Sequence, residues 1–459
     1  MKVAFLFFNG YDGVGERVLA EEHRHWLISK GHKCDFFAFH LGRIRDLIDK
    51  SVIALNIDSL KETFKMMDST YDVIMINSWP IKIEFWNPTR LFELYQAFCL
   101  FEKAITVSLL QDATSTAYLR RPLLPSFVSL TDVTLTFSKT GSFFTSLMQK
   151  IPSYEVFRMQ ELLLCINSNK LEAIRDRSQD VSFEKKQDAL LVPGRMSSFK
   201  SPWRIFELQA ELNRIDSNFI TYVLGMDRSI GCVTKMLRDP LANNLVPANS
   251  MYSQMLPDKH LPAKTQIYGV YSFSQLIDFL SQVKFGGTFY HMKDGEESDY
   301  GDRMEYAMIE VAASTVPVFD KRWALHNRLR NDPSHSLYSN LDFGIWVDSD
   351  PSDAVAKILE VTNNKNQYQR MKDLSFNIVR SEFDPETNLT ITYENIFKVK
   401  KRSYRIDLTK EQIRATMSDG VPVCSFKPHT AKNPIFSITY DKRGSIVTVD
   451  EKVKSKYLW

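Results

Sequence analysis

The sequence lacks the apolar segments that would place it in or across a membrane. No apolar run reaches the ~18 residues that a membrane-spanning helix needs. At the N-terminus six apolar residues, 3–8, precede Asn9 and Gly10, which is too few for the apolar region of a secretory signal peptide. We therefore expect no membrane partner and no secretory signal, and we expect the protein to act in the cytoplasm.

Cysteine is scarce and scattered. The chain has five cysteines, an odd number, and no CxxC pair: Cys34, Cys99, Cys165, Cys232 and Cys424. This usage fits a reducing compartment and argues against a disulfide framework and against a zinc site. We expect no metal and no resident cofactor.

Neither sign of charge is in large excess, since the chain has 58 Lys and Arg against 55 Asp and Glu. A net charge of +3 indicates no class of partner and excludes a protein that coats nucleic acid. The sequence also lacks internal repeats and low-complexity tracts. With 44% hydrophobic and 25% charged residues, the composition is that of an ordinary globular chain.

Short apolar strands alternate with amphipathic helical segments over most of the chain. In the first half we predict strands at 3–8, 34–39, 73–76, 105–110 and 133–137, with a helix that ends near Gly31. In the second half we predict strands at 190–192, 219–224, 287–290 and 316–319 and helices at 202–212, 274–284 and 303–313. The polar stretch 167–187 reads as a linker or a surface excursion between the two halves. Alternation of this kind predicts two doubly wound α/β domains with parallel sheets.

A glycine-rich loop, 9–15, follows the first strand and contains Gly10, Gly13 and Gly15. Glycines let the backbone approach a ligand, and the N-terminus of the next helix favours an anion. The spacing is not GxGxxG, and no acidic residue ends the second strand, so a dinucleotide site is disfavoured. An unstrained strand-to-helix turn is the alternative interpretation.

A second loop, 194–200, follows a strand and carries Arg195 and Lys200, five residues apart. An arginine fork and a lysine point charge can hold a diphosphate from two sides and replace a metal ion as its charge develops. An ordinary solvated loop is the alternative.

The segment 302–318 is an apolar helix that leads into a strand and carries Glu310 in its middle. A carboxylate on so apolar a helix is costly unless it is paired or bonded to a ligand, and sugar hydroxyls are suitable donors. A buried glutamate bonded to backbone is the alternative. This helix with its Val316-Pro317-Val318 ending resembles the Glu-x7-Glu donor signature of GT-B glycosyltransferases. Glu310 matches the second glutamate, and Asp302 stands at the first.

The chain to about residue 400 also resembles the DNA α-glucosyltransferases of T-even bacteriophages, which glucosylate 5-hydroxymethylcytosine in double-stranded DNA. Five blocks carry the resemblance in order: the glycine loop with 22–26 and 31–32, then 76–80, then 111–112 with 119–121, then 194–200, and finally 305–310 with 315–319. The resemblance implies a GT-B fold: an N-terminal Rossmann-like acceptor domain over 1–180, a nucleotide-sugar domain over 181–380, and a helix over 381–400 that returns to the first domain. Residues 401–459 have no counterpart in this family.

The resemblance also assigns roles. Arg195 and Lys200 would bind the donor diphosphate, Glu305 and Glu310 the donor ribose or sugar, and Gly13 and Gly15 would let the acceptor-domain loop approach the phosphates.

Asp112 matches the candidate catalytic carboxylate of the family. A hydroxymethyl group is a weak nucleophile, and a carboxylate can accept its proton as the bond forms. A helix N-cap is the alternative role for Asp112, since Ala113, Thr114 and Ser115 follow it. Gln111 stands where the family pattern has His, which weakens any mechanism that needs an imidazole there.

Contacts to DNA would come from basic residues of the first domain, namely Arg43, Arg45, Arg120 and Arg121. A hydroxymethyl group inside a duplex is best reached by flipping the nucleotide out of the stack.

Two further signals are discounted. The triplet Asp348-Ser349-Asp350 looks like a DxD metal site, but it precedes a helix start and is better explained by capping. His23, Arg24 and His25 either contact phosphate or lie on an exposed helix face.

The sequence therefore predicts a metal-independent, retaining GT-B enzyme, expected to be a monomer in the cytoplasm of an infected cell. It would transfer glucose, or a related sugar such as arabinose, from a UDP-sugar to hydroxymethylcytosine in duplex DNA and so protect phage DNA from restriction. The acceptor could also be an already glycosylated base. The alternatives are a glycosyltransferase that builds a bacterial surface polysaccharide and a non-catalytic nucleotide- or DNA-binding protein of the same fold.

Overall fold

The structure is a computed structural model of the 459-residue chain. It describes residues 1–7, 15–38, 52–55, 57–77, 88–110, 127, 130–136, 159–194, 202–215, 218–224, 263–268, 271, 273–289, 304–321, 341–401, 404–406, 409–419, 423–428, 436–440 and 446–451. The chain divides into two compact units. Unit 1 comprises Met1–Cys165 and Pro385–Trp459, and unit 2 comprises Ile166–Asp384.

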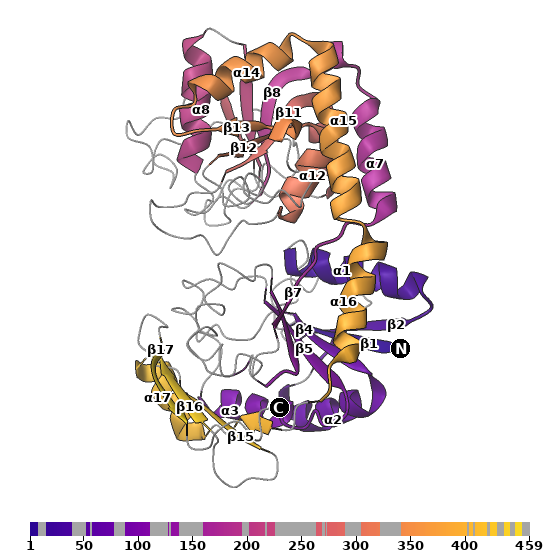
Figure 1. The fold of residues 1–459 in the computed structure, drawn as a ribbon, viewed down its shortest axis with the longest axis vertical. Coiled ribbons are helices and arrows are strands. Elements are labelled where there is room, and N and C mark those ends of the chain that lie inside the picture. Colours follow the sequence, from indigo (N-terminus) through magenta and orange to yellow (C-terminus); the bar gives the residue numbers. More distant parts are fainter. Residues whose placement is uncertain are drawn as a thin grey trace. The chain divides into compact units, whose positions relative to one another are not determined.

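Unit 1 contains a seven-stranded parallel sheet in the order β3-β2-β1-β4-β5-β6-β7 (Figure 1). Its strands are β1 Lys2–Phe7, β2 Lys33–Ala38, β3 Val52–Ala54, β4 Val73–Asn77, β5 Ile105–Leu110, β6 Val133–Thr136 and β7 Met159–Glu161. Val3 through Phe7 are all at most 3% exposed, as are Val73 through Ile76. This continuous burial is what the uninterrupted apolar runs of the sequence predict for parallel strands covered on both faces.

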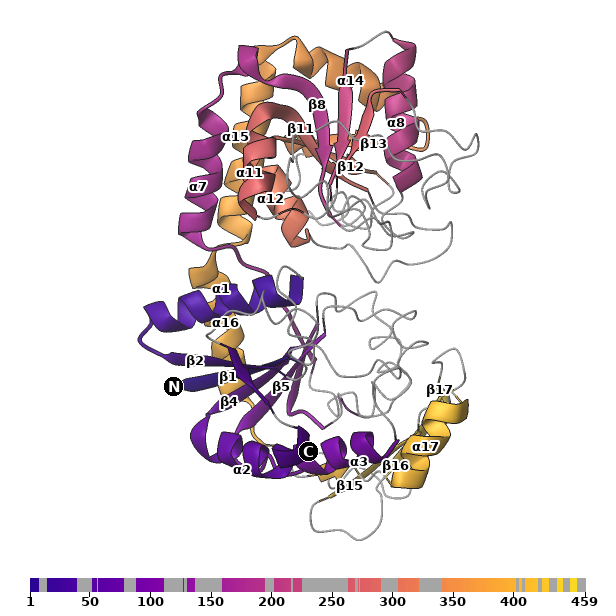
Figure 2. The ribbon, with the colours of Figure 1, turned by 180° about the vertical axis from the view of Figure 1, so that it is seen from behind.

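In the described parts of 1–400, the helices of unit 1 are α1 Gly15–Ser29, α2 Leu60–Thr70, α3 Pro88–Phe98 and α16 Pro385–Lys398, with a short 3₁₀ turn at Ile57–Ser59. Helices α1 and α16 pack together, and α2 packs on α3 (Figures 1 and 2). Trp26 of α1 stacks on Tyr393 of α16, with ring centroids 5.4 Å apart. This contact joins the segment after residue 384 to the N-terminal sheet.

His23 is part of the same contact, and neither of the predicted alternatives for it is correct. The side chain is fully buried, and Nδ1 lies 3.1 Å from the hydroxyl of Tyr393. Burial lowers the pKa of His23 to about 3. His23 is therefore a neutral core residue of unit 1, neither exposed nor a phosphate ligand.

Unit 2 contains a six-stranded parallel sheet in the order β10-β9-β8-β11-β12-β13. Its strands are β8 Gln187–Val192, β9 Ile220–Val223, β10 Thr265–Ile267, β11 Val283–Thr288, β12 Val316–Asp320 and β13 Ile345–Val347. Both sheets thus follow the doubly wound arrangement, in which the strand order reverses beside the first strand. The reversal falls between β1 and β4 in unit 1 and between β8 and β11 in unit 2.

The helices of unit 2 form two groups (Figure 2). Helices α7 Ser168–Gln179, α11 Phe273–Gln282, α12 Tyr306–Ser314 and α15 Lys365–Glu382 pack together, and α8 Pro202–Arg214 packs on α14 Ser352–Thr362. Short 3₁₀ turns lie at Phe183–Lys185 and Leu341–Phe343.

The prediction of a linker at 167–187 is wrong, because this stretch contains α7 and the start of β8. Leu171 and Ile174 are buried at helical spacing within an otherwise charged segment, and Asn167 caps the helix by accepting from the amides of Asn169 and Lys170. Since α7 packs on α11 and α12, the boundary between the units lies at Cys165, before the predicted position at residue 180.

Residues beyond 400 include a separate four-stranded antiparallel sheet. Its strands, in order, are β14 Tyr404–Ile406, β15 Val423–Pro428, β16 Phe436–Tyr440 and β17 Ile446–Glu451, and α17 Lys410–Asp419 lies between the first two along the chain. Helix α17 packs on α3, so this segment belongs to unit 1.

Candidate functional site

Most of the predicted site residues lie outside the described part of the chain. These are Gly13, Arg43, Arg45, Asp112, Arg120, Arg121, Arg195 and Lys200, and their assignments stay predictions. Gly15, Glu305 and Glu310 lie within it. The elements that flank the missing residues are described: β1 ends before the glycine loop and α1 begins at Gly15, β5 ends at Leu110, and β8 ends just before Gly194.

The loop that carries Arg195 and Lys200 leaves the sheet of unit 2 at a position suited to a ligand. It follows β8, the strand next to which the order reverses, at the carboxyl edge where open α/β sheets bind their ligands. Gly194 begins this loop with φ at 122°, in a region where a side chain would strain the backbone. The glycine of this motif is therefore required by the conformation of the turn.

Glu310 is buried on α12 and paired with a cation from another helix. The residue is 8% exposed, and Lys170 Nζ of α7 lies 3.2 Å from Glu310 Oε1. Burial raises the pKa of Glu310, and the charge and hydrogen bond of Lys170 act in the opposite direction. The same ammonium lies 4.4 Å from the centre of the Phe273 ring. Lys170 therefore favours the ionised carboxylate, which accepts hydrogen bonds.

Tyr271 connects Glu310 to the start of the Gly194 loop. Burial raises the pKa of the Tyr271 phenol, the negative charge of Glu310 raises it further, and a hydrogen bond from the Gly194 backbone lowers it. The phenol of Tyr271 is therefore influenced both by the Glu310 carboxylate and by the Gly194 backbone, which belong to two separate motifs in the sequence. Neither Tyr271 nor Lys170 was predicted, because nothing local to either residue marks it as a partner of Glu310.

Glu305 occupies the N-cap position of α12 and is half-buried. Its backbone oxygen accepts from the amides of Met308 and Ile309 and so starts the helix. The ion pair of Glu310 is formed with Lys170, on the side of α12 that packs on α7. The two glutamates thus occupy different environments on α12.

Gly286 of β11 lets α12 pack close to the sheet. A Cβ atom there would lie 2.7 Å from Val311 Cγ1 and 2.8 Å from Thr315 Oγ1, both of which are fully buried. Such distances are below normal van der Waals contact, so a larger residue would push α12 outward. The glycine therefore sets the position of the helix that carries Glu310.

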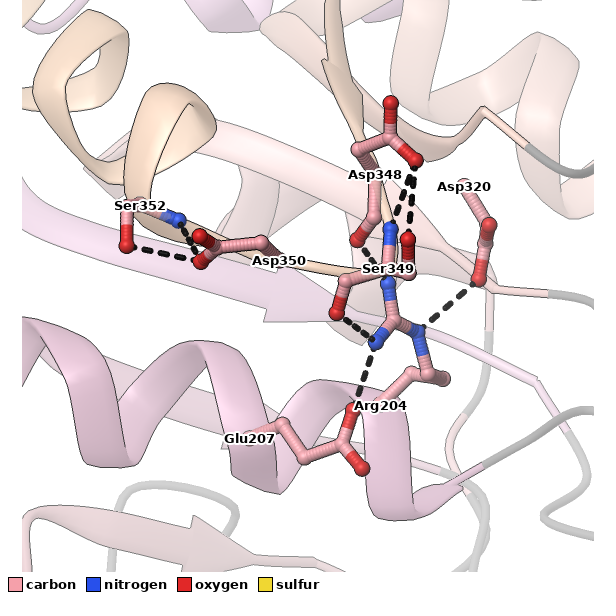
Figure 3. A network of polar contacts seen from close by, with 7 residues as sticks. All are labelled: Arg204, Glu207, Asp320, Asp348, Ser349, Asp350 and Ser352. Carbon is pink, nitrogen blue, oxygen red and sulfur yellow. Dashed lines mark hydrogen bonds and ion pairs between the residues drawn. The ribbon is translucent and has the colours of Figure 1, made fainter.

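Arg204 fastens the first turn of α8 to the carboxyl edge of the sheet (Figure 3). The guanidinium is 4% exposed, and its Nε donates to Asp320 Oδ2 at 3.2 Å, where Asp320 ends β12 and is fully buried. It also donates to Glu207 at 2.6 Å and to the carbonyl oxygens of Asp348 and Ser349, just after β13. One side chain thus joins the first turn of α8 to two strand ends.

The Asp348-Ser349-Asp350 triplet is occupied by local contacts, as the capping interpretation predicts. Asp350 accepts from the amide and hydroxyl of Ser352, at the start of α14 (Figure 3). Asp348 pairs with Lys321 at 2.8 Å, and this lysine helps to lower the pKa of Asp348 to about 2. Within the described ranges no group of three or more His, Cys, Asp or Glu residues could hold a metal ion.

Helices of the described segments are all too short or too polar to cross a bilayer. No family model and no curated protein matches the sequence.

Several solved structures match the fold. An α-glucosyltransferase in complex with UDP-glucose and DNA containing an abasic site has a TM-score of 0.69 and 18% identity, over 87% of this chain and 99% of that chain. An α-glucosyltransferase in complex with UDP and a 13-mer DNA containing an HMU base has a TM-score of 0.67 and 18% identity, over 87% of this chain and all of that chain. Anabaena HepE in complex with UDP and glucose has a TM-score of 0.58 and 14% identity, over 87% of this chain and 100% of that chain. Together with its two doubly wound sheets, these similarities show that the chain has the α/β two-domain GT-B fold.

Proposed function

We propose that this protein is a glycosyltransferase that moves a sugar from a UDP-sugar to 5-hydroxymethylcytosine in double-stranded DNA. The observation that carries the proposal is the buried Glu310 on α12 with Lys170 as its counter-ion, in the unit whose strand β8 leads into Gly194 beside the strand-order reversal. Among the similar folds, one is bound to UDP-glucose and DNA and another to UDP and DNA with an HMU base, which supports this donor and this acceptor.

The donor would bind at the carboxyl edge of unit 2. Arg195 and Lys200 would hold the diphosphate, and Glu305 and Glu310 would face the ribose or sugar. An ionised Glu310 can accept hydrogen bonds from hydroxyl groups of the ligand, and Lys170 favours this ionised form against the effect of burial. Gly13 and Gly15 would let the loop before α1 approach the phosphates.

In the reaction, the hydroxymethyl oxygen attacks the anomeric carbon of the donor and its proton passes to Asp112. The bond from the anomeric carbon to the diphosphate breaks, and UDP leaves with the bonding electrons. Arg195 and Lys200 stabilise the charge that develops on the diphosphate, so the proposed reaction needs no metal ion. The anomeric configuration is retained, as the family resemblance implies.

On the acceptor side, Arg43, Arg45, Arg120 and Arg121 would contact DNA phosphates while the target nucleotide is flipped out of the duplex. The sugar would shield phage DNA from restriction enzymes of the host. The similarity to HepE, in complex with UDP and glucose, supports the donor class alone and leaves a non-DNA acceptor as the second candidate function.

A donor panel tests this proposal. Radiolabelled UDP-glucose, UDP-arabinose and other UDP-sugars are incubated with hydroxymethylated duplex, glucosylated duplex and unmodified duplex, with and without EDTA. We expect transfer of one sugar to the hydroxymethylated duplex, no transfer to unmodified DNA, and full activity in EDTA. Label that stays off every DNA substrate but appears on a polysaccharide acceptor would favour the second candidate.

A further inference from the structure

The segment beyond residue 400 is fastened to unit 1 at its first residue. Lys401 Nζ lies 2.8 Å from Asp132 Oδ2 and donates to the carbonyl oxygen of Ala104 at 2.7 Å. Asp132 is 1% exposed and also accepts from the amide and hydroxyl of Thr106 at 2.9 Å. This buried carboxylate anchors Lys401, so the segment starts from a fixed point between β5 and β6.

Helix α17 fastens the segment a second time. Thr409 and Gln412 form a capping box, in which each side chain bonds the amide of the other residue. Ile413 is fully buried, and α17 packs on α3. Arg414, the next residue, is exposed, and Lys410 is half-buried. Within 409–414 the helix therefore buries Ile413 in unit 1 and exposes Arg414 to solvent.

The segment has a charge balance opposite to that of the rest of the chain. Residues 401–459 contain 12 Lys and Arg against 6 Asp and Glu, whereas residues 1–400 contain 46 against 49. A chain with a net charge of +3 thus consists of an acidic part with a net charge of −3 and a short basic part with a net charge of +6. The near-neutral total conceals a local concentration of positive charge.

Two of these cations oppose each other across the antiparallel pair of β14 and β15. The register places Arg405 directly opposite Lys427. The backbone register thus places two basic residues of the segment at one position of the sheet.

We propose that residues 401–459 form an accessory module that binds the phosphate backbone of duplex DNA without reading its sequence. The module rests on the proposed function, because DNA is the acceptor in that reaction. It is attached to unit 1, which would carry the acceptor contacts, so its cations would add to those of Arg43, Arg45, Arg120 and Arg121. A second contact on the same duplex raises affinity through effective concentration and leaves the chemistry unchanged.

Charge-neutralising variants of the full chain test the module. One double variant carries Lys410→Gln and Arg414→Gln on α17, and the other carries Arg405→Gln and Lys427→Gln in the sheet. The matched control, Lys185→Gln with Arg370→Gln, removes two exposed cations from unit 2. Binding to an unmodified 24-bp duplex is followed by fluorescence anisotropy over a range of salt concentrations, and UDP affinity is measured by calorimetry.

Each module variant should bind the duplex about 3- to 10-fold more weakly at low salt, and its salt slope should fall by about 1 to 2. Both variants should keep wild-type UDP affinity, and the control should bind DNA like wild type.

The outcomes separate this inference from the proposed function. If wild type transfers sugar to DNA but both module variants bind DNA with the affinity and salt slope of the control, the inference is overturned. If wild type transfers no sugar to any DNA while the module variants still lose salt-dependent DNA binding, the inference stands and the acceptor assignment fails. Preferential binding of anionic lipid vesicles by the module, over duplex DNA, would also overturn it.

Discussion

Helix α1 of unit 1 and helix α12 of unit 2 each pack on a parallel sheet, and each buries a titratable side chain. On α12 the buried Glu310 has a cation, Lys170, within 3.2 Å. On α1 the buried His23 lies between Phe5 and Tyr393, and burial alone lowers its pKa to about 3. A counter-ion favours the charged form of a buried group, whereas burial among aromatic rings favours the neutral form. The same sheet topology thus holds an ion-paired carboxylate in one unit and an uncharged imidazole in the other.

The largest effect should come from breaking the buried ion pair of unit 2. Arg204→Met leaves Asp320 charged, fully buried and without its guanidinium, and should lower the free energy of unfolding by about 3–5 kcal/mol. Denaturant unfolding measures the change. Adding Asp320→Asn to Arg204→Met should recover part of the loss, since the uncompensated charge is removed. A single variant as stable as wild type would show that the pair does not hold α8 in place.

The pH dependence of unit 1 should follow His23. Its pKa is 6.5 in the unfolded chain and about 3 in the fold, so the unfolded state binds a proton first and stability falls as the pH drops from 6.5 toward 3. The slope is about 1.4 kcal/mol per pH unit, which gives a loss of roughly 2 kcal/mol at about pH 5. His23→Gln should remove this dependence in denaturant titrations. An unchanged profile in the variant would assign the acid sensitivity to other groups.

Overpacking should displace α12 and test how closely it must lie on the sheet. Gly286→Ala places a methyl group 2.7 Å from Val311 Cγ1 and should cost about 1–3 kcal/mol. Val311→Ala in the same chain makes room and should restore most of the stability. Thermal unfolding of the single and double variants measures both stabilities. Equal losses of stability in the two variants would show that the strain does not arise from contact with Val311.

The smallest effect should come from removing the counter-ion of Glu310. The charged and titratable groups that face Glu310 among the described residues are Lys170 from α7 and Tyr271. Because Lys170 lowers the pKa of Glu310, Lys170→Met should raise it, and UDP binding that needs the carboxylate should weaken at a higher pH than in wild type. We expect a loss of a few-fold near neutral pH and recovery in Lys170→Arg. A pH profile of UDP affinity that does not move would exclude Glu310 as an ionised ligand group.

The sequence predicts the sheets better than the contacts between distant residues. Apolar runs such as 3–7 and 73–76 indicate buried parallel strands because both faces of each strand are covered. Helix α7 was missed because its buried residues are few and the rest of its face is charged. Arg204 and Asp320 are 116 positions apart, and Lys170 and Glu310 are 140 apart. Only the folded chain brings such pairs together, so local patterns give no sign of them.

In the candidate site, too, the local motifs are predictable from the sequence and the contacts between distant residues are not. The motifs around Gly194 and Glu310 are predicted from spacing and residue type, and the structure shows the positive φ of Gly194 and the burial of Glu310 beside Lys170. Asp112, Arg195 and Lys200 lie outside the described residues and stay predictions.

The central claim is that this chain places a sugar from a UDP-sugar on hydroxymethylcytosine. Its most direct measurement is mass spectrometry of the nucleosides released from hydroxymethylated duplex after incubation with the protein and each UDP-sugar. We predict a glycosylated hydroxymethylcytidine with one donor, formed by wild type and strongly reduced in Glu310→Gln. Hydroxymethylcytidine that stays unmodified with every donor, although calorimetry shows that the protein binds UDP, would contradict the account.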